Sequence, residues 1–342
     1  MTKPLVSVLI SAYNAEDWIG YTLQSAVAQT WPNKEIIVVD DGSTDGTAEI
    51  ARQFIPRGVT VISIKNGGLS AGQNCAYRYS HGDYIQFLDA DDVLALDKIE
   101  RQLSALTASD TKRVLLSSPW APFYYRTRRA HFIRNSVWED LTPLEWLLRK
   151  LGENLHMQNA TWLVSRELAE AAGPWDESLW YDQDGEYFTR VLMASEHTKF
   201  VPETGIFYRQ STSRRVSYIG DSDEKKESLV RSMKFHIRCL LSLEDTERTR
   251  KACLTYLQNW YHQFYGGRAD LAEELQGMAA ELGGSLQKPQ LGWKYAWMKP
   301  ILGWEKTKWA QTVFPELKAS CIRQWDKTMY RLENNPNPLP IL

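Results

Sequence analysis

Strand-like and helix-like patterns alternate along the first hundred residues. Four short runs, rich in β-branched residues and apolar on both faces, predict strands at Leu5–Ser11, Glu35–Asp40, Val59–Ile64 and Tyr84–Leu88. Apolar residues at helical spacing predict helices at Glu16–Gln29, Thr47–Phe54, Ser70–Ser80 and Asp97–Leu106. Strands that are apolar on both faces are typical of parallel sheets covered on both sides. The alternation therefore predicts an α/β fold with a mostly parallel sheet, right-handed crossovers and flanking helices.

The pattern is less regular in the second part of the chain. It predicts strands at Val114–Ser118, Phe123–Arg126 and Lys199–Arg209, and helices at Pro143–Leu151, Ser165–Ala172 and Asp184–Ser195. After the polar stretch Ser211–Asp221 it is helical, with segments at Glu224–Leu243, Thr246–Tyr265 and Ala269–Leu282. We therefore place a domain boundary near Gly220. It separates an α/β domain at residues 1–220 from a helical C-terminal region at residues 221–342.

Charge and cysteine content exclude some classes of function. The 40 Lys and Arg residues against 42 Asp and Glu give a net charge of −2, which predicts no broad basic surface for nucleic acid. The four cysteines are scattered without a CxxC pair, so they predict reduced thiols rather than disulfides or a zinc site. No stretch approaches the roughly 20 apolar residues of a membrane span, and the first apolar run is too short for a secretion signal. We expect a cytoplasmic protein.

Polar or glycine-rich segments follow each of the first four predicted strands. They are Ser11–Glu16, Asp40–Gly46, Lys65–Gly68 and Asp89–Asp92. In open α/β sheets, ligands bind beyond the carboxyl ends of the strands. We expect these four segments to form one site.

The segment Asp89–Asp92 (sequence DADD) crowds three carboxylates at the end of a buried strand. Such crowding is costly unless a partner offsets the repulsion. Mg²⁺ and Mn²⁺ bind one or two carboxylates together with substrate phosphates, so a divalent cation is one such partner. The alternative is a solvated acidic turn in which Asp92 or Asp97 caps the next helix. The place of this segment among the other strand ends favours the metal site.

Asp41 and Tyr13 are candidates for binding a base. A carboxylate at a strand end can accept a hydrogen bond from the N–H of a pyrimidine, and Tyr13 offers a flat face for stacking. Other residues of the same loop, Ser43, Thr44 and Asp45, are suited to capping the following helix whatever the function is.

Together these segments resemble a known family. The blocks "VSVLISAYNAEDWIGYTLQSAVAQTWPNKEIIVVDDGSTDGT", "NGGLSAGQNCA" and "YIQFLDADD" are similar, in order and spacing, to the glycosyltransferase family 2 enzymes of GT-A fold. The likeness is strong over Leu5–Asp97 and continues more weakly to Arg209. It implies transfer of a sugar from a nucleotide diphosphate sugar to an acceptor hydroxyl, with inversion. It also implies that residues 1–110 bind the donor and residues 111–220 form the acceptor side.

The resemblance assigns roles by position. It places Ala12, Tyr13 and Glu16 at the base and ribose, Asp41 as acceptor from the base, and Asp89 near the ribose and donor sugar. An Asp at position 41 suits the N3–H of uracil, which implies a UDP-linked donor. Asp91 matches the direct ligand of Mn²⁺ or Mg²⁺, the cation that bridges the diphosphate in the family.

Two positions depart from the family pattern. Gln73 precedes Asn74 where the family has an Arg, which removes a fixed charge from the loop after the third strand. In "WYDQDGEYFTR" (Trp180–Arg190), Gln183 replaces the Glu of a Glu-Asp pair and Asp184 matches its Asp.

We predict that Asp184 is the general base that takes the proton of the acceptor, with Asp182 and Glu186 as rivals. The alternative is that these are helix N-terminal carboxylates favoured by the helix dipole. Arg190 is predicted to stabilise the helix by an ion pair.

The segment "YRQSTSRR" (Tyr208–Arg215) corresponds to the loop that closes over the diphosphate in the family. Arg209 is the predicted phosphate contact, with Arg214 and Arg215 as further candidates, and a solvated basic loop is the alternative.

The tryptophan-rich segment "LGWKYAWMKPILGWEKTKW" (Leu291–Trp309) has two interpretations. One is a peripheral contact with the inner face of the membrane that brings a lipid-linked acceptor to the site. The other is packing on the catalytic domain or on a second subunit of a homo-oligomer, because Trp is also common in such contacts.

By analogy with the family, the acceptor is a glycan of a surface polysaccharide. Two other classes stay open. A sugar nucleotidyltransferase would carry a glycine-rich loop with Arg or Lys after the first strand, and Ser11–Glu16 has neither feature. A non-catalytic nucleotide- or glycan-binding relative is the other class, and the substitutions at Gln73 and Gln183 give it some support.

Overall fold

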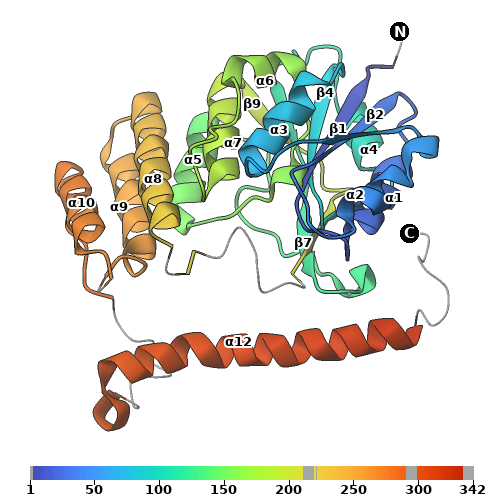
Figure 1. The fold of residues 1–342 in the computed structure, drawn as a ribbon. Coiled ribbons are helices and arrows are strands. Elements are labelled where there is room, and N and C mark those ends of the chain that lie inside the picture. Colours follow the sequence, from blue (N-terminus) through green and yellow to red (C-terminus); the bar gives the residue numbers. More distant parts are fainter. Residues whose placement is uncertain (1–2, 211–218, 221, 266, 290–298, 334–342) are drawn as a thin grey trace.

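The computed structural model describes residues 3–210, 219–220, 222–265, 267–289 and 299–333. A five-stranded sheet has the order β3-β2-β1-β4-β8 (Figure 1). Its strands are β1 (Val6–Ala12), β2 (Lys34–Asp40), β3 (Val59–Ser63), β4 (Tyr84–Asp89) and β8 (Val164–Ser165). The first four strands pair in parallel, and β8 is antiparallel to β4. The predicted α/β fold with a mostly parallel sheet is confirmed, and the four predicted strands agree with the observed ones to within one residue at each end.

Alternate residues along each strand enter two hydrophobic clusters, one on each face of the sheet. In β1, Val8 and Ile10 belong to one cluster and Leu9 to the other. The first cluster is covered by α1 (Ile19–Val27), α2 (Thr47–Arg52) and α4 (Lys98–Ser104). The second is covered by α3 (Leu69–Arg78), α5 (Pro143–Glu153), α6 (Arg166–Ala172) and α7 (Gln183–Ala194). Burial on both faces explains why these strands lack a polar side.

Two smaller sheets lie beside the central one. One has the order β5-β10-β7, with β5 at Val93–Leu94, β10 at Ile206–Arg209 and β7 at Trp120–Phe123, and the other pairs β6 (Val114–Ser117) with β9 (His197–Phe200). Short 3₁₀ turns occur at Ile55–Arg57, Thr127–Arg129 and Asn159–Thr161.

Two strand predictions in this part were wrong. The strand expected at Phe123–Arg126 lies at Trp120–Phe123, because these residues pair with β10. The single strand expected at Lys199–Arg209 is two strands in different sheets, since the chain turns between Phe200 and Ile206.

The C-terminal region is helical, as expected. Helices α8 (Asp223–Leu243) and α9 (Glu247–Tyr261) stand beside α5 and α7, and α10 (Ala269–Glu281) packs on the outer side of α8 and α9 (Figure 1). Their buried residues, among them Leu229, Met233 and Leu257, belong to the same hydrophobic cluster as α5 and α7. A continuous core therefore crosses the predicted boundary near Gly220.

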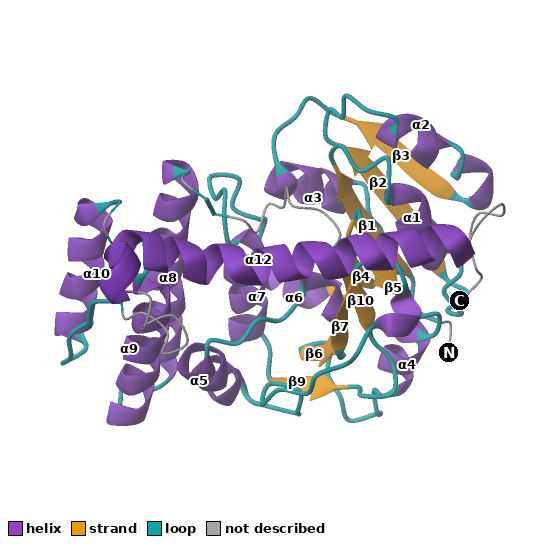
Figure 2. Cartoon of the chain, turned by 90° about the horizontal axis from the view of Figure 1, so that it is seen from below, coloured by secondary structure: helices purple, strands orange, loops and turns teal. Residues whose placement is uncertain are grey.

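Helix α12 (Lys299–Glu333) runs the length of the molecule, from the helical region to the sheet, with a kink at Gly303 (Figure 2). Its last turns contact residues that follow the carboxyl ends of β1 and β7. Asp326 is buried and accepts from the Arg126 side chain at 2.7 Å and from the Tyr125 backbone N–H at 2.9 Å. Tyr330 bonds Tyr21. The end of α12 is thereby attached to the α/β domain close to the strand ends.

Part of the tryptophan-rich segment, with Trp293 and Trp297, lies outside the described residues, as do Arg214 and Arg215. Within the described ranges, no helix is both long enough and apolar enough to cross a membrane.

Candidate active site

The carboxyl ends of β1, β2 and β4 meet at one edge of the sheet. Ala12, the last residue of β1, is paired with Asp40, the last of β2, and Ser11 is paired with Asp89, the last of β4. The backbone N–H of Asp41 donates to the Ala12 carbonyl at 2.8 Å, which holds the first two ends together. The predicted residues at these ends are therefore neighbours.

Asp41 organises the loop after β3. Its buried carboxylate accepts the backbone N–H groups of Gly67 at 2.8 Å and Gly68 at 2.9 Å, one on each oxygen. Burial raises the pKa of Asp41, and the two hydrogen bonds oppose this shift. Because each carboxylate oxygen has two acceptor positions, the group retains capacity to accept a base N–H.

Tyr13 and Glu16 lie at the surface of the same edge. The Tyr13 side chain is 53% exposed, as a stacking platform requires. The Glu16 carboxylate accepts the backbone N–H of Gly46 at 2.8 Å and so fixes the glycine-containing loop that precedes α2.

The three aspartates of the acidic turn have different surroundings. Asp89 accepts from Asn159 at 2.7 Å and from Gln158 at 3.2 Å. Asp92 is fully buried and accepts from Gln158 at 2.5 Å and from the backbone N–H of Arg209 at 2.8 Å. Asp91 lies between them and is half-buried. Asp89 and Asp92 are thus held by the protein interior.

Burial, and next the charge of Asp91, raise the pKa of Asp89 to about 7, and the same two causes raise that of Asp92 well above its ordinary value. The crowding inferred from the sequence is therefore real, and a divalent cation at Asp91 would offset it. In the described part of the chain no three His, Cys, Asp or Glu side chains are arranged to hold a metal ion. The residues fit a cation that is bound by the Asp91 carboxylate and takes its remaining ligands from substrate oxygens, as Mg²⁺ commonly does.

Arg209 lies beneath the acidic turn rather than on its surface. It is 4% exposed, and its side chain donates to the carbonyls of Asp91 at 2.7 Å and Tyr124 at 3.1 Å. Its guanidinium lies 4.2 Å from the ring centroid of Trp18 and 4.4 Å from that of Phe123. This placement favours a role in holding the turn over the predicted contact with a donor phosphate.

Gln73 and Asn74 have different positions on α3. Gln73 is fully buried, and within the described residues its side-chain amide has no hydrogen-bond partner. Asn74 accepts the backbone N–H of Trp175 at 2.8 Å and donates to the Glu177 carboxylate at 2.8 Å. Asn74 therefore joins the donor side to the segment that leads into α7.

Asp184 lies in the first turn of α7 and is half-buried. Burial, followed by the charge of Asp182, raises the pKa of Asp184, while His156 and Lys150 oppose the shift. The charge of Asp184 also contributes to the raised pKa of Asp89. The predicted base and the predicted donor-site carboxylate are therefore close enough to interact across one site.

The rival carboxylates are engaged elsewhere. Glu186 forms a two-pronged ion pair with Arg190, with both N–O distances at 2.8 Å, which confirms the ion pair expected for Arg190. Asp182 accepts a hydrogen bond from Ser232 of α8.

Sequence reasoning missed several residues of this site. Gln158 precedes, and Asn159 begins, the short turn under the acidic residues. Trp180 packs on Gly68 of the loop after β3. Asn159 was visible only as part of an Asn-x-Thr triplet, and in the structure it is buried on Asp89. Their role depends on contacts between segments that are distant in sequence, so no local sequence pattern predicts it.

A family model agrees with this geometry. Residues 7–171 match the model for glycosyl transferase family 2. The resemblance to glycosyltransferase family 2 is thereby confirmed over this segment. The matched segment includes all the predicted donor-side residues from Ala12 to Asp91 and ends before α7.

Curated relatives match this chain over part of their length. An uncharacterized glycosyltransferase of Rickettsia prowazekii is 31% identical over 193 residues, which is 56% of this chain and 60% of that protein. An Escherichia coli protein named UDP-Glc:alpha-D-GlcNAc-diphosphoundecaprenol beta-1,3-glucosyltransferase is 40% identical over 116 residues, 33% of this chain and 44% of that protein. The chain thus spans at most about 60% of either relative.

Solved structures share the fold at low sequence identity. Staphylococcus aureus TarS 1–349 in complex with UDP-GlcNAc has a TM-score of 0.61 and 17% identity, covering 81% of each chain. The mannosyltransferase PcManGT of Pyrobaculum calidifontis in complex with GDP-Man and Mn²⁺ has a TM-score of 0.53 and 18% identity, covering 96% of this chain and 89% of that one. The GT-A fold expected from the sequence is confirmed.

Proposed function

We propose that this protein transfers a sugar from a nucleotide diphosphate sugar, UDP-linked, to the hydroxyl of a glycan acceptor, with inversion. The observation that carries the proposal is the clustering of Asp40, Asp41 and Asp89 at the carboxyl ends of neighbouring strands, with Asp184 near enough for its charge to contribute to the raised pKa of Asp89. A base and a donor site that face each other are what inverting transfer needs. Relatives and structural neighbours named for UDP-Glc, UDP-GlcNAc and GDP-Man support this class of donor.

The donor is expected to bind between the loops that follow β1, β2 and β4. Tyr13 provides the stacking face, Asp41 accepts from the uracil N3–H, and Ala12 and Glu16 border the ribose. A Mn²⁺ or Mg²⁺ ion held by Asp91 would neutralise the diphosphate and stabilise the leaving UDP. The Mn²⁺ in the PcManGT complex supports a divalent cation of this kind.

In the transfer step, the acceptor oxygen attacks the anomeric carbon from the face opposite the diphosphate. The C–O bond to the diphosphate breaks, UDP leaves with the bonding electrons, and the acceptor proton moves to the Asp184 carboxylate. The raised pKa of Asp184 suits it to this task, because a base acts best when its pKa lies nearer the working pH.

A panel of nucleotide sugars tests the proposal. The protein is incubated with UDP-, GDP- and dTDP-sugars and Mn²⁺, and release of the nucleoside diphosphate is measured with and without glycan acceptors. We expect release with a UDP-sugar. No release with any donor would favour the non-catalytic relative, and formation of a nucleotide sugar from a triphosphate would favour a nucleotidyltransferase.

We further propose that α12 makes a peripheral contact with an anionic membrane surface, where a lipid-linked acceptor would reach the site. Four side chains of its last five turns are exposed apolar groups: Leu317 (55% exposed), Ile322 (45%), Trp325 (54%) and Leu332 (70%). Its two acidic residues there, Asp326 and Glu333, are paired with Arg126, whereas Lys318, Arg323, Lys327 and Arg331 add positive charge. Apolar and basic side chains on one helix are typical of interfacial binding.

Vesicle sedimentation tests this contact. We expect the protein to pellet with phosphatidylglycerol vesicles more than with phosphatidylcholine vesicles, and the double variant Ile322→Glu/Leu332→Glu to stay in the supernatant. Ile55→Glu, an equally exposed apolar position away from α12, is the control and should pellet normally. Equal pelleting of the double variant would contradict the proposal, and loss of self-association without any vesicle binding would assign the face to a second subunit.

A further inference from the structure

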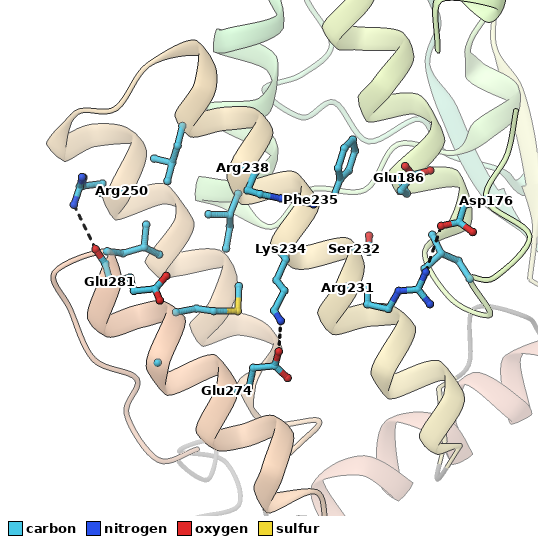
Figure 3. Close-up of a pocket in the computed structure, with 16 residues that line it drawn as sticks. Asp176, Glu186, Arg231, Ser232, Lys234, Phe235, Arg238, Arg250, Glu274 and Glu281 are labelled. Carbon is cyan, nitrogen blue, oxygen red and sulfur yellow. Dashed lines mark hydrogen bonds and ion pairs between the residues drawn. The ribbon is translucent and has the colours of Figure 1, made fainter. Parts of the chain in front are cut away.

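Helix α8 contacts the segment that leads into α7 at successive positions along one face. The hydroxyl of Ser228 accepts the backbone N–H of Trp180 at 2.9 Å. Arg231 donates to the Ser178 hydroxyl at 2.7 Å and lies 3.4 Å from the Asp176 carboxylate (Figure 3). These contacts come from beyond the predicted boundary at Gly220 and reach the loop that precedes α7, the helix that carries the proposed base.

Asp182, the residue just before α7, also contacts α8. Its φ of 58° lies in the left-handed region, which residues with a side chain rarely adopt. Its carbonyl accepts the backbone N–H of Glu186 at 3.0 Å, which begins the helix. Its carboxylate lies against Gly185 in the first turn of α7, accepts from Ser232, and lies 3.8 Å from Nδ1 of His236.

Two neighbours show how closely Asp182 is held. A Cβ at Gly185 would lie 2.1 Å from Oδ1 of Asp182, so only glycine fits there. His236 is fully buried and bonds the Tyr256 hydroxyl of α9 at 3.1 Å. Burial lowers the pKa of His236 well below its ordinary value, which favours the neutral ring.

We infer that Ser232 and His236 of α8 are positioning residues for Asp184. They hold Asp182 in the left-handed conformation that starts α7 and thereby fix the direction in which Asp184 projects. The inference rests on the proposed function of Asp184 as the base. It makes α8 a part of the catalytic unit rather than of a separate C-terminal region.

Figure 3 also supplies a matched control on the same helix. A groove of about 1020 Å³ lies between α8 and α10 and is lined by Ser232 and Lys234 among others. Lys234 forms an ion pair with Glu274 of α10 across this groove, and no contact of its side chain with the segment before α7 is found among the described residues. A change at Lys234 perturbs α8 without touching Asp182.

The first test compares Ser232→Ala, Ser232→Thr and Lys234→Ala in the donor assay. We expect kcat to fall on the order of 10²-fold in Ser232→Ala with the donor KM within about twofold, because a small displacement of the base costs this much. Ser232→Thr, which keeps the hydroxyl, should recover most of the loss, and Lys234→Ala should match the wild type. Wild-type kcat in Ser232→Ala, or an equal loss in Lys234→Ala, would overturn the inference.

The second test is the pH profile of Asp182→Asn, which keeps a side chain able to bond Ser232. The charged and titratable groups that face Asp184 are Asp182, Tyr181, Asp89, Lys150 and His156. Because the charge of Asp182 raises the pKa of Asp184, its removal should move the acid limb of kcat to lower pH. An acid limb that does not move would show that Asp182 is not held against Asp184 and would overturn the inference.

The variant Asp184→Asn distinguishes failure of the proposed base from failure of the proposed positioning role of α8. If Asp184→Asn is fully active, the base assignment itself fails. A different result would leave the base in place and remove only the positioning role. In that case Asp184→Asn is inactive, Ser232→Ala has the wild-type kcat, and the pH profile of Asp182→Asn is not shifted.

Discussion

Replacing Asp184 by Asn is expected to lower kcat for sugar transfer by roughly 10²–10⁴-fold, the usual contribution of a general base. Asn has nearly the same shape but cannot take the acceptor proton. Donor binding should not change, because the donor side is built from the loops after β1, β2 and β4 and its contacts do not involve the Asp184 side chain. The measurement is kcat with a saturating donor, with UDP affinity by calorimetry in parallel.

Glu186→Gln is the matched control for that variant. It removes a carboxylate two residues away on the same helix, but one that is paired with Arg190. We expect Glu186→Gln to transfer sugar at close to the wild-type rate. If Glu186→Gln were inactive and Asp184→Asn active, the two residues would have to exchange roles.

The second large effect is expected at Arg209. Arg209→Met should lower the free energy of unfolding by about 3–5 kcal/mol, the usual cost of removing one partner from a buried charged cluster. The change removes the donors to the Asp91 and Tyr124 carbonyls and leaves Asp92, fully buried, without its positive neighbour. Urea unfolding followed by circular dichroism measures the difference.

Arg101→Ala is the control for this prediction. Arg101 forms a surface ion pair with Asp97 at 2.8 Å, and surface pairs contribute little to stability. Its unfolding curve should stay close to that of the wild type. If Arg209→Met were as stable as the wild type but bound UDP more weakly, the result would contradict the structural role and support the phosphate contact predicted from the sequence.

The sequence was informative wherever local pattern determines structure. Strands β1 to β4 are apolar on both faces because helices cover both sides of the sheet. The ends of the apolar runs therefore predicted the ends of these strands closely. The clustering of Asp41, Asp89 and Asp91 at one edge also followed from the sequence, since parallel strands end at the same edge.

The remaining features depend on contacts between distant segments. Arg209 was predicted to contact phosphate because Arg suits that role. In the structure β10 pairs with β7, and the Arg209 side chain lies beneath the acidic residues, where it donates to the Asp91 carbonyl. Gln158 is bonded to carboxylates 66 and 69 positions earlier in the chain, which no spacing rule describes. Likewise, the attachment of α12 depends on an ion pair between Arg126 and Asp326, 200 residues apart.

The proposed metal site at the strand ends is tested most directly by titrating UDP into the protein with and without Mn²⁺, for the wild type and Asp91→Ala. The account predicts that the wild type binds UDP substantially more tightly with Mn²⁺ than with EDTA, and that Asp91→Ala abolishes this difference. Equal affinity of the wild type with and without the metal, or an unchanged dependence in Asp91→Ala, would contradict it.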